Sequence, residues 1–185
     1  MRPTLIISWL WTLFCVVWLI SAIGAKRTVS RRSGAWIFRT LVFVAIAYLI
    51  SRSESRAYAF HVRVPATPAM EAIGIVCTAI GIAFAFWARF YLGRNWGMPM
   101  SVQESAELVT TGPYAYVRNP IYTGMLLALL GTAIVVGAWW LSLFAISAVY
   151  FTYSAKQEEK LLLKQFPDTF PAYRARTKML VPFLF

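Results

Sequence analysis

The chain has 185 residues, of which 59% are hydrophobic and only 14% are charged, and its mean hydropathy is +0.62. An average soluble domain is about one-quarter charged, so this balance excludes an ordinary soluble protein and indicates an integral membrane protein. The net charge is +11, but the basic residues cluster between apolar runs. That pattern is typical of membrane topology signals and argues against nucleic acid as a partner.

The cysteine and histidine content argues against a metal-dependent mechanism. Cys15 and Cys77 both lie inside apolar runs, and His61 is the only histidine in the sequence. Without a Cys-x-x-Cys pair, no zinc or haem site forms at a recognisable spacing. We therefore expect no metal and interpret both cysteines as apolar packing residues.

Two apolar segments open the chain. Residues 4–24 are uncharged and long enough to cross a bilayer, which takes about 20 residues. A cleaved signal peptide is the alternative, but the apolar run is long for a signal core and a basic cluster follows it at once. Residues 35–50 form the second predicted span. Residues 52–68 form a polar loop whose prolines stop any helix.

Residues 69–92 predict a third span. Glu71 near its start and Arg89 near its end suit the helix macrodipole, which favours an acid at the first turn and a base at the last. That placement is a sufficient structural explanation of both charges.

The next uncharged stretch, residues 121–154, is too long for one span. As a single helix it would be about 50 Å long, against a hydrocarbon core of about 30 Å. Gly137 offers a break near its middle. We therefore predict two helices, 121–136 and 138–155, in a tight hairpin. The expected fold is an all-α integral membrane protein with about five transmembrane helices.

The distribution of basic residues orients these spans. If the connector 93–120 and the C-terminal tail are cytoplasmic, few basic residues remain outside, namely Arg2, Arg52, Arg56 and Arg63. The positive-inside rule then places the N-terminus outside and the C-terminus in the cytoplasm. We divide the chain into an N-terminal pair of spans with its outer loop, 1–68, and a core, 69–185.

The cytoplasmic segments carry the remaining signals. Residues 108–124 contain turn signals at Gly112-Pro113 and Asn119-Pro120 and read Leu-Val-Thr-Thr-Gly-Pro-Tyr-Ala-Tyr-Val-Arg-Asn-Pro-Ile-Tyr-Thr-Gly. Beyond the fifth span, interleaved lysines and apolar residues predict an amphipathic helix leaving the membrane. The adjacent Glu158 and Glu159 in that helix are suited to holding a cation just below the membrane.

These motifs resemble the isoprenylcysteine carboxyl methyltransferase family. That family lies within a wider group of membrane methyltransferases that includes the phospholipid N-methyltransferases. The resemblance rests on four motifs in the right order: Leu-Gly-Arg-Asn-Trp at 92–96, the run at 108–124, Glu-Glu-x-x-Leu at 158–162, and Tyr-x-x-Arg-Thr at 173–177. It covers about half of the chain.

The resemblance implies an enzyme that uses S-adenosylmethionine without a Rossmann domain, and no Gly-x-Gly-x-x-Gly motif follows a strand here. It implies a cytoplasmic cofactor pocket closed by the connector and the C-terminal tail, with a lipophilic substrate entering from the bilayer. In this alignment Glu158 would hold the cofactor's ammonium. The cofactor-binding residues carried over position by position are Glu107, Leu108, Val109, Tyr114, Asn119, Pro120, Ile121, Tyr122 and Glu158.

Two positions depart from the family's pattern. Asn119 stands where eukaryotic members have His, and Ser154 stands where the prenylcysteine enzymes have the Arg that meets the substrate carboxylate. Another arginine would then meet the acceptor's anion or orient it. The candidates are Arg94, Arg118 and Arg176, with Arg89 as a further one.

We expect a membrane methyltransferase that acts on a lipophilic acceptor, with a carboxylate as the leading interpretation. Phospholipid amine N-methylation is the first alternative. The second is a non-enzymatic membrane protein or an enzyme built on the sterol-reductase scaffold. The expected partners are the lipophilic substrate and membrane lipids, and the expected location is a bacterial or archaeal inner membrane.

Overall fold

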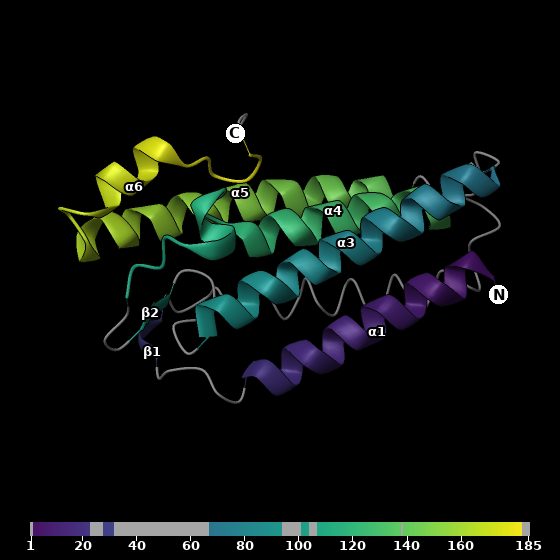
Figure 1. Cartoon of the computed structure of the whole chain (residues 1–185), viewed down its shortest axis with the longest axis horizontal. Coiled ribbons are helices and arrows are strands. Elements are labelled where there is room, and N and C mark those ends of the chain that lie inside the picture. The colour runs from purple at the N-terminus through teal and green to yellow at the C-terminus, as the bar shows by residue number, and fades with distance from the viewer. Residues whose placement is uncertain are drawn as a thin grey trace.

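The computed structural model describes residues 2–22, 28–31, 67–93, 101–103, 107–137 and 139–182. The helices within these ranges are α1 (Pro3–Ala22), α3 (Pro68–Leu92), α4 (Pro120–Val136), α5 (Trp139–Gln165) and α6 (Phe170–Arg176). A 3₁₀ turn, η2, precedes α4 at Gly112–Ala115, and two short strands are present, β1 (Thr28–Arg31) and β2 (Ser101–Gln103) (Figure 1).

Helix α3 begins and ends at capping residues. The Thr67 side chain accepts a hydrogen bond from the Met70 amide at 3.3 Å, and Pro68 occupies the first turn, where its missing N–H loses nothing. The helix ends at Gly93, whose φ of 54° is one that glycine adopts readily. These caps account for the close agreement between α3 and the predicted span 69–92.

Small residues bring α3 and α4 into direct backbone contact. A Cβ built on Gly81 would lie 2.5 Å from the Gly124 carbonyl oxygen, and one built on Gly124 would lie 2.5 Å from the Gly81 carbonyl oxygen. Such separations leave no room for a side chain on either residue. Close approach through small residues is how helices commonly associate inside membranes.

Helix α1 runs along α3 (Figure 1) and contacts both α3 and α4 through aromatic and polar side chains. Phe14 stacks on Phe86 of α3, with ring centroids 5.7 Å apart. The indole N–H of Trp11 donates to the Thr132 hydroxyl of α4 at 3.0 Å. Interhelical hydrogen bonds of this kind join helices where no water is available.

Helices α4 and α5 form an antiparallel pair. Gly137 ends α4 with a φ of 138°. Tyr122 in the first turn of α4 stacks on Phe151 of α5, while Ala133 near the end of α4 clusters with Trp140 near the start of α5. The chain therefore reverses its direction after Gly137.

Helix α5 is longer than the predicted segment 138–155. It continues through the stretch expected to form a separate amphipathic helix and ends only at Gln165. No glycine or proline interrupts residues 139–165, so nothing in the local sequence breaks the hydrogen-bond ladder. One helix axis therefore carries both the apolar segment and the adjacent acids Glu158 and Glu159.

The two strands form a short antiparallel ladder. Thr28 lies opposite Gln103, and Arg31 lies opposite Ser101. Within the described residues this ladder is the departure from an all-α architecture. The ladder lies at the end of the helices where α1 and α3 both finish and where α6 also lies (Figure 1).

Two of the described helices are long and apolar enough to cross a membrane, Pro3–Ser21 of α1 and Pro68–Leu92 of α3. Helix α4 is apolar but shorter. The predicted span at 35–50 and nearly all of the predicted loop at 52–68 lie outside the described residues. The count of five spans, the crossing of the membrane by the α4–α5 pair and the division at residue 68 therefore stay predictions.

Candidate active site

The connector that precedes α4 docks onto the last turns of α3. The Tyr91 hydroxyl and the Thr111 hydroxyl share a hydrogen bond at 2.7 Å. Gly112 has a φ of 59°, and a Cβ there would lie 2.6 Å from the Tyr91 ring, so both the backbone and the neighbouring ring require glycine. Tyr114 is buried and donates its hydroxyl to the Ala88 carbonyl at 3.4 Å. The predicted Gly-Pro turn thus seats the connector on α3.

Glu158 and Tyr122 make the central polar contact of the site. The Tyr122 hydroxyl donates to Glu158 Oε1 at 2.6 Å. Hydrogen bonds to a carboxylate are shorter and stronger than those between neutral groups. Tyr122 is buried in the first turn of α4, and Glu158 is half-buried on α5. The bond therefore fixes the orientation of the Glu158 carboxylate.

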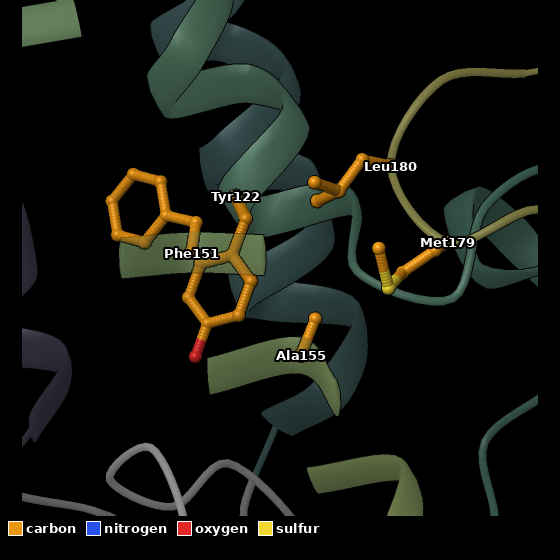
Figure 2. Packing of buried hydrophobic residues seen from close by; sticks show 5 residues of the cluster. All are labelled: Tyr122, Phe151, Ala155, Met179 and Leu180. Atoms are coloured by element: carbon orange, nitrogen blue, oxygen red, sulfur yellow. The ribbon is translucent and has the colours of Figure 1, made fainter. Parts of the chain in front are cut away.

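An apolar cluster holds the Tyr122 ring in place. The ring stacks on Phe151 with centroids 4.7 Å apart and an interplanar angle of 8°. Ala155 of α5 packs in the same cluster, together with Met179 and Leu180 from the C-terminal tail (Figure 2). Three segments distant in sequence therefore determine where the Tyr122 hydroxyl points.

The second acid of the pair, Glu159, has different partners. Arg118 Nε donates to Glu159 Oε1 at 2.7 Å, and the side chains of Arg118 and Glu159 are each only 10% exposed. Arg174 approaches the other carboxylate oxygen at 3.4 Å, but its side chain is 59% exposed. Arg118 also donates through one terminal nitrogen to the carbonyl oxygens of Thr177 and Arg174.

Backbone pairing joins the tail to the connector. Val117 and Lys178 form a parallel bridge, and the Arg118 amide donates to the Lys178 carbonyl at 2.8 Å. The Asn119 amide and the Asn119 side chain both donate to the Met179 carbonyl, at 3.2 Å and 3.1 Å. Asn119 therefore binds the tail backbone, which is a structural use for this position.

Burial raises the pKa of two tyrosines that lie outside the apolar helices. Burial, followed by the negative charge of Glu158, raises the pKa of Tyr114 far above its ordinary value. Burial raises the pKa of Tyr173 to about 12, against the opposing influence of Arg118. Both phenols are therefore neutral at physiological pH, and Tyr173 donates its hydroxyl to the Tyr114 carbonyl at 2.8 Å.

The structure brings part of the predicted cofactor set together. Tyr114, Tyr122 and Glu158 lie within mutual electrostatic influence, and Asn119 lies beside them against the tail. Of the other predicted cofactor residues, Pro120 is buried in the first turn of α4, Leu108, Val109 and Ile121 are half-buried, and Glu107 is exposed.

The predicted arginines are spread out. Arg118 is engaged with Glu159, and exposed Arg176 lies over the Tyr173 ring, 5.8 Å from its centroid. Arg89 is buried in α3 and donates to the Gly93 carbonyl at 2.9 Å. Arg94 lies outside the described residues. A role in meeting the acceptor's anion stays a prediction for each of them.

Sequence reasoning missed the residues that complete the cluster around Tyr122. Phe151, Met179 and Leu180 carry no chemical signal, because apolar residues are common throughout this chain. The apolar tail after Thr177 was the available signal, because apolar residues near a predicted site are expected to pack against another apolar surface. No pattern in the sequence predicts that Glu158 and Glu159 contact different residues.

The arrangement suits recognition of a small cation. A carboxylate, neutral phenols and stacked aromatic faces attract ammonium and sulfonium groups. Within the described residues, no group of three or more His, Cys, Asp or Glu side chains is placed to hold a metal ion. Among the residues that the structure describes, the apolar cluster around Tyr122 contains no serine, cysteine, lysine or histidine, so binding and orientation are the chemistry that it offers.

Comparison with known proteins identifies the family. The family model described as phospholipid methyltransferase matches residues 70–169. A nickel-cobalt-cadmium resistance protein, NccN, from Alcaligenes xylosoxydans xylosoxydans is 35% identical over 96 residues, covering 49% of this chain and 44% of that protein. A protein-S-isoprenylcysteine O-methyltransferase from Schizosaccharomyces pombe is 35% identical over 119 residues, covering 62% of this chain and 49% of that protein.

The chain thus spans about half the length of the curated relatives it matches. The family match covers both Tyr122 and Glu158, as well as the α3–α4 contact that carries the connector. It also confirms the resemblance drawn from the motifs, because the family includes the isoprenylcysteine enzymes. The chain belongs to the phospholipid methyltransferase family.

Proposed function

We propose that this protein is an integral-membrane methyltransferase that transfers a methyl group from S-adenosylmethionine to a lipophilic acceptor. One observation carries the proposal: the Tyr122 hydroxyl holds the Glu158 carboxylate at 2.6 Å within an aromatic cluster, inside the segment that matches the family. An oriented carboxylate among aromatic rings fits a cofactor that has an ammonium at one end and a sulfonium at its centre.

The residues present fit this cofactor. Glu158, which the Tyr122 hydroxyl orients, would accept the ammonium, and the aromatic rings of Tyr114 and Tyr122 would line the site. Backbone and apolar contacts would come from residues 107–109 and 119–121. When bound, S-adenosylmethionine supplies an electrophilic methyl group for an in-line displacement.

The chain's own residues would orient the reactants and exclude water from the site. Such a displacement needs no protein nucleophile, and a site that orients its reactants and excludes water accelerates it. The raised pKa of Tyr114 keeps its phenol a neutral donor at physiological pH, so it is unsuited to act as a general base. Met179 and Leu180 of the tail cover the Tyr122 ring and keep water from it.

We propose a carboxylate as the acceptor, by analogy with the relative described as a protein-S-isoprenylcysteine O-methyltransferase. The amine of a phospholipid headgroup is the second candidate, and a specific observation favours it. Arg118, one of the arginines suited to meeting a carboxylate, is engaged with Glu159. In both cases the acceptor would enter from the bilayer, and the location proposed is a bacterial or archaeal inner membrane with the C-terminus in the cytoplasm.

The cofactor is tested by calorimetric titration of the detergent-purified protein with S-adenosylhomocysteine. We expect micromolar binding in the wild type and at least about tenfold weaker binding in Glu158→Gln and Tyr122→Phe, since each change removes one half of a charge-assisted hydrogen bond. Glu71→Gln, which removes a carboxylate in the first turn of α3, is the matched control and should bind normally. A folded, monodisperse wild type that binds nothing would refute the proposal and make a nicotinamide cofactor, as in the reductase alternative, the next ligand to titrate.

The acceptor class is tested with methyl-labelled S-adenosylmethionine in membranes that contain the protein. Carboxyl methyl esters release their label as methanol in alkali, whereas N-methyl groups retain it. Alkali-labile label would support a carboxylate acceptor. Alkali-stable label in the phospholipid fraction would support the amine.

A further inference from the structure

Two adjacent acids on α5 have different partners. Glu158 accepts a hydrogen bond from Tyr122, whereas Glu159 is paired with Arg118. Neighbouring residues of an α-helix point about 100° apart, so the two carboxylates leave α5 in different directions. Arg118 lies in the connector two residues before α4 begins, and Tyr122 lies in the first turn of α4, four residues further along the chain. One short segment therefore engages both acids.

We propose that Arg118 and Glu159 are a positioning pair that closes the C-terminal tail over the connector and thereby holds the Tyr122–Glu158 contact in its binding geometry. The proposal rests on the proposed function, in which that contact receives the cofactor. It assigns Arg118 to orientation and gives it no contact with the acceptor.

Burial and hydrogen bonding both support a fixed junction. Side chains of opposite charge that are each 10% exposed need one another, because a charge left alone at such a site is strongly destabilising. Arg118 also donates from one terminal nitrogen to the Thr177 and Arg174 carbonyls, so one guanidinium joins α5 to the tail. The Arg174 side chain is largely exposed, and its contact with Glu159 adds little.

The junction reaches Tyr122 through the tail. Immediately after Thr177, the carbonyls of Lys178 and Met179 receive the Arg118 and Asn119 amides. Met179 and the next residue, Leu180, then pack in the cluster that contains the Tyr122 ring. Loss of the ion pair would free the tail at Thr177 and uncover the ring. The orientation of the hydroxyl toward Glu158 would then be lost.

The two possible roles of Arg118 predict different results in the absence of acceptor. A residue that only meets the acceptor's anion leaves S-adenosylhomocysteine binding unchanged when no acceptor is present. A positioning residue weakens that binding. The titration is therefore made without acceptor, on Arg118→Met, Glu159→Leu and the double variant. Lys160→Met, which removes an exposed charge next to the pair, is the matched control.

A second measurement follows the tail directly. Trypsin cleavage after Lys178 releases residues 179–185, and mass spectrometry gives the rate of release. We expect each single variant to bind S-adenosylhomocysteine at least about tenfold more weakly and to release the peptide faster than Lys160→Met. The double variant should be no worse than the worse single variant, because the two residues act as one unit.

Two results would overturn the proposal. The first is a folded Arg118→Met protein with unchanged affinity for S-adenosylhomocysteine. The second is peptide release at the control rate in both single variants. If the wild type itself binds no S-adenosylhomocysteine, the proposed function fails. The rates of peptide release then decide alone whether Arg118 and Glu159 hold the tail. Faster release in the single variants then supports the pair, and equal rates overturn it.

Discussion

The contact between α3 and α4 makes Gly124→Ala a sharp test of the fold around the site. The added Cβ would lie 2.5 Å from the Gly81 carbonyl oxygen and 2.8 Å from the Ala85 amide nitrogen. Ordinary carbon contacts are about 3.5–4.0 Å, so the methyl group is roughly 1 Å too close to backbone atoms that have no rotamer to change. The helices must therefore separate.

Two opposing terms set the magnitude. Overpacking costs about 1–3 kcal/mol, and backbone neighbours place this site at the upper end. Replacing glycine by alanine inside a helix returns about 1 kcal/mol of propensity. The net destabilisation is about 2 kcal/mol, which corresponds to a fall of about 4–8 °C in the midpoint of thermal unfolding for a chain of this size.

The assay compares thermal unfolding of wild type, Gly124→Ala and Ser142→Ala in the same detergent. Ser142 is exposed on α5, so its replacement tests the effect of alanine in a helix without a collision. Because Gly124 lies two residues beyond Tyr122, the variant should also bind S-adenosylhomocysteine more weakly. A midpoint equal to or above that of Ser142→Ala would show that α3 and α4 are not in direct backbone contact.

Two further predictions concern alkaline pH and the attachment of α1. Burial raises the pKa of Tyr173 to about 12 from an ordinary value of 10.0, so its contribution to stability is complete below pH 10 and is lost as the pH rises toward 12. Thermal unfolding at several alkaline pH values should show this decline, and a Tyr173→Phe variant that declines just as steeply would contradict it. Thr132→Val removes the acceptor of the Trp11 indole N–H and should destabilise the protein by about 0.6–1.7 kcal/mol. Denaturant unfolding checks this value, with Thr12→Val on the exposed face of α1 as control, and equal stability of the two variants would refute the role of the hydrogen bond.

The helix boundaries were predictable because their signals are local. The span 69–92 was predicted from its apolar run, and the residues that bound α3 in the structure, Thr67-Pro68 and Gly93, act on their own neighbours. The continuity of α5 was missed because a change of composition near residue 155 resembled a boundary. A change from apolar to charged residues alters the solvent that a helix prefers, but it does not interrupt the backbone hydrogen bonds of the helix.

The site was predictable only as far as the family motifs reached. Tyr122 and Glu158 were named together as cofactor residues, and they are in direct contact. The pairing of Arg118 with Glu159 was not foreseen, because it joins residues 41 positions apart and depends on the path of the tail. The strands β1 and β2 were also missed, since their pairing depends on two connectors meeting in space.

The tail is joined to the connector through its backbone, and this determines which sequence changes the tail can accept. The Arg118 and Asn119 amides bind the carbonyls of Lys178 and Met179, and every residue type supplies a carbonyl. Exchange of the exposed Lys178 side chain should therefore be neutral over evolutionary time. A change in length is different, because one inserted or deleted residue between Thr177 and Leu180 would move the apolar side chains out of the Tyr122 cluster. Among relatives, position 178 should vary in composition, while the stretch from 177 to 180 should keep its spacing.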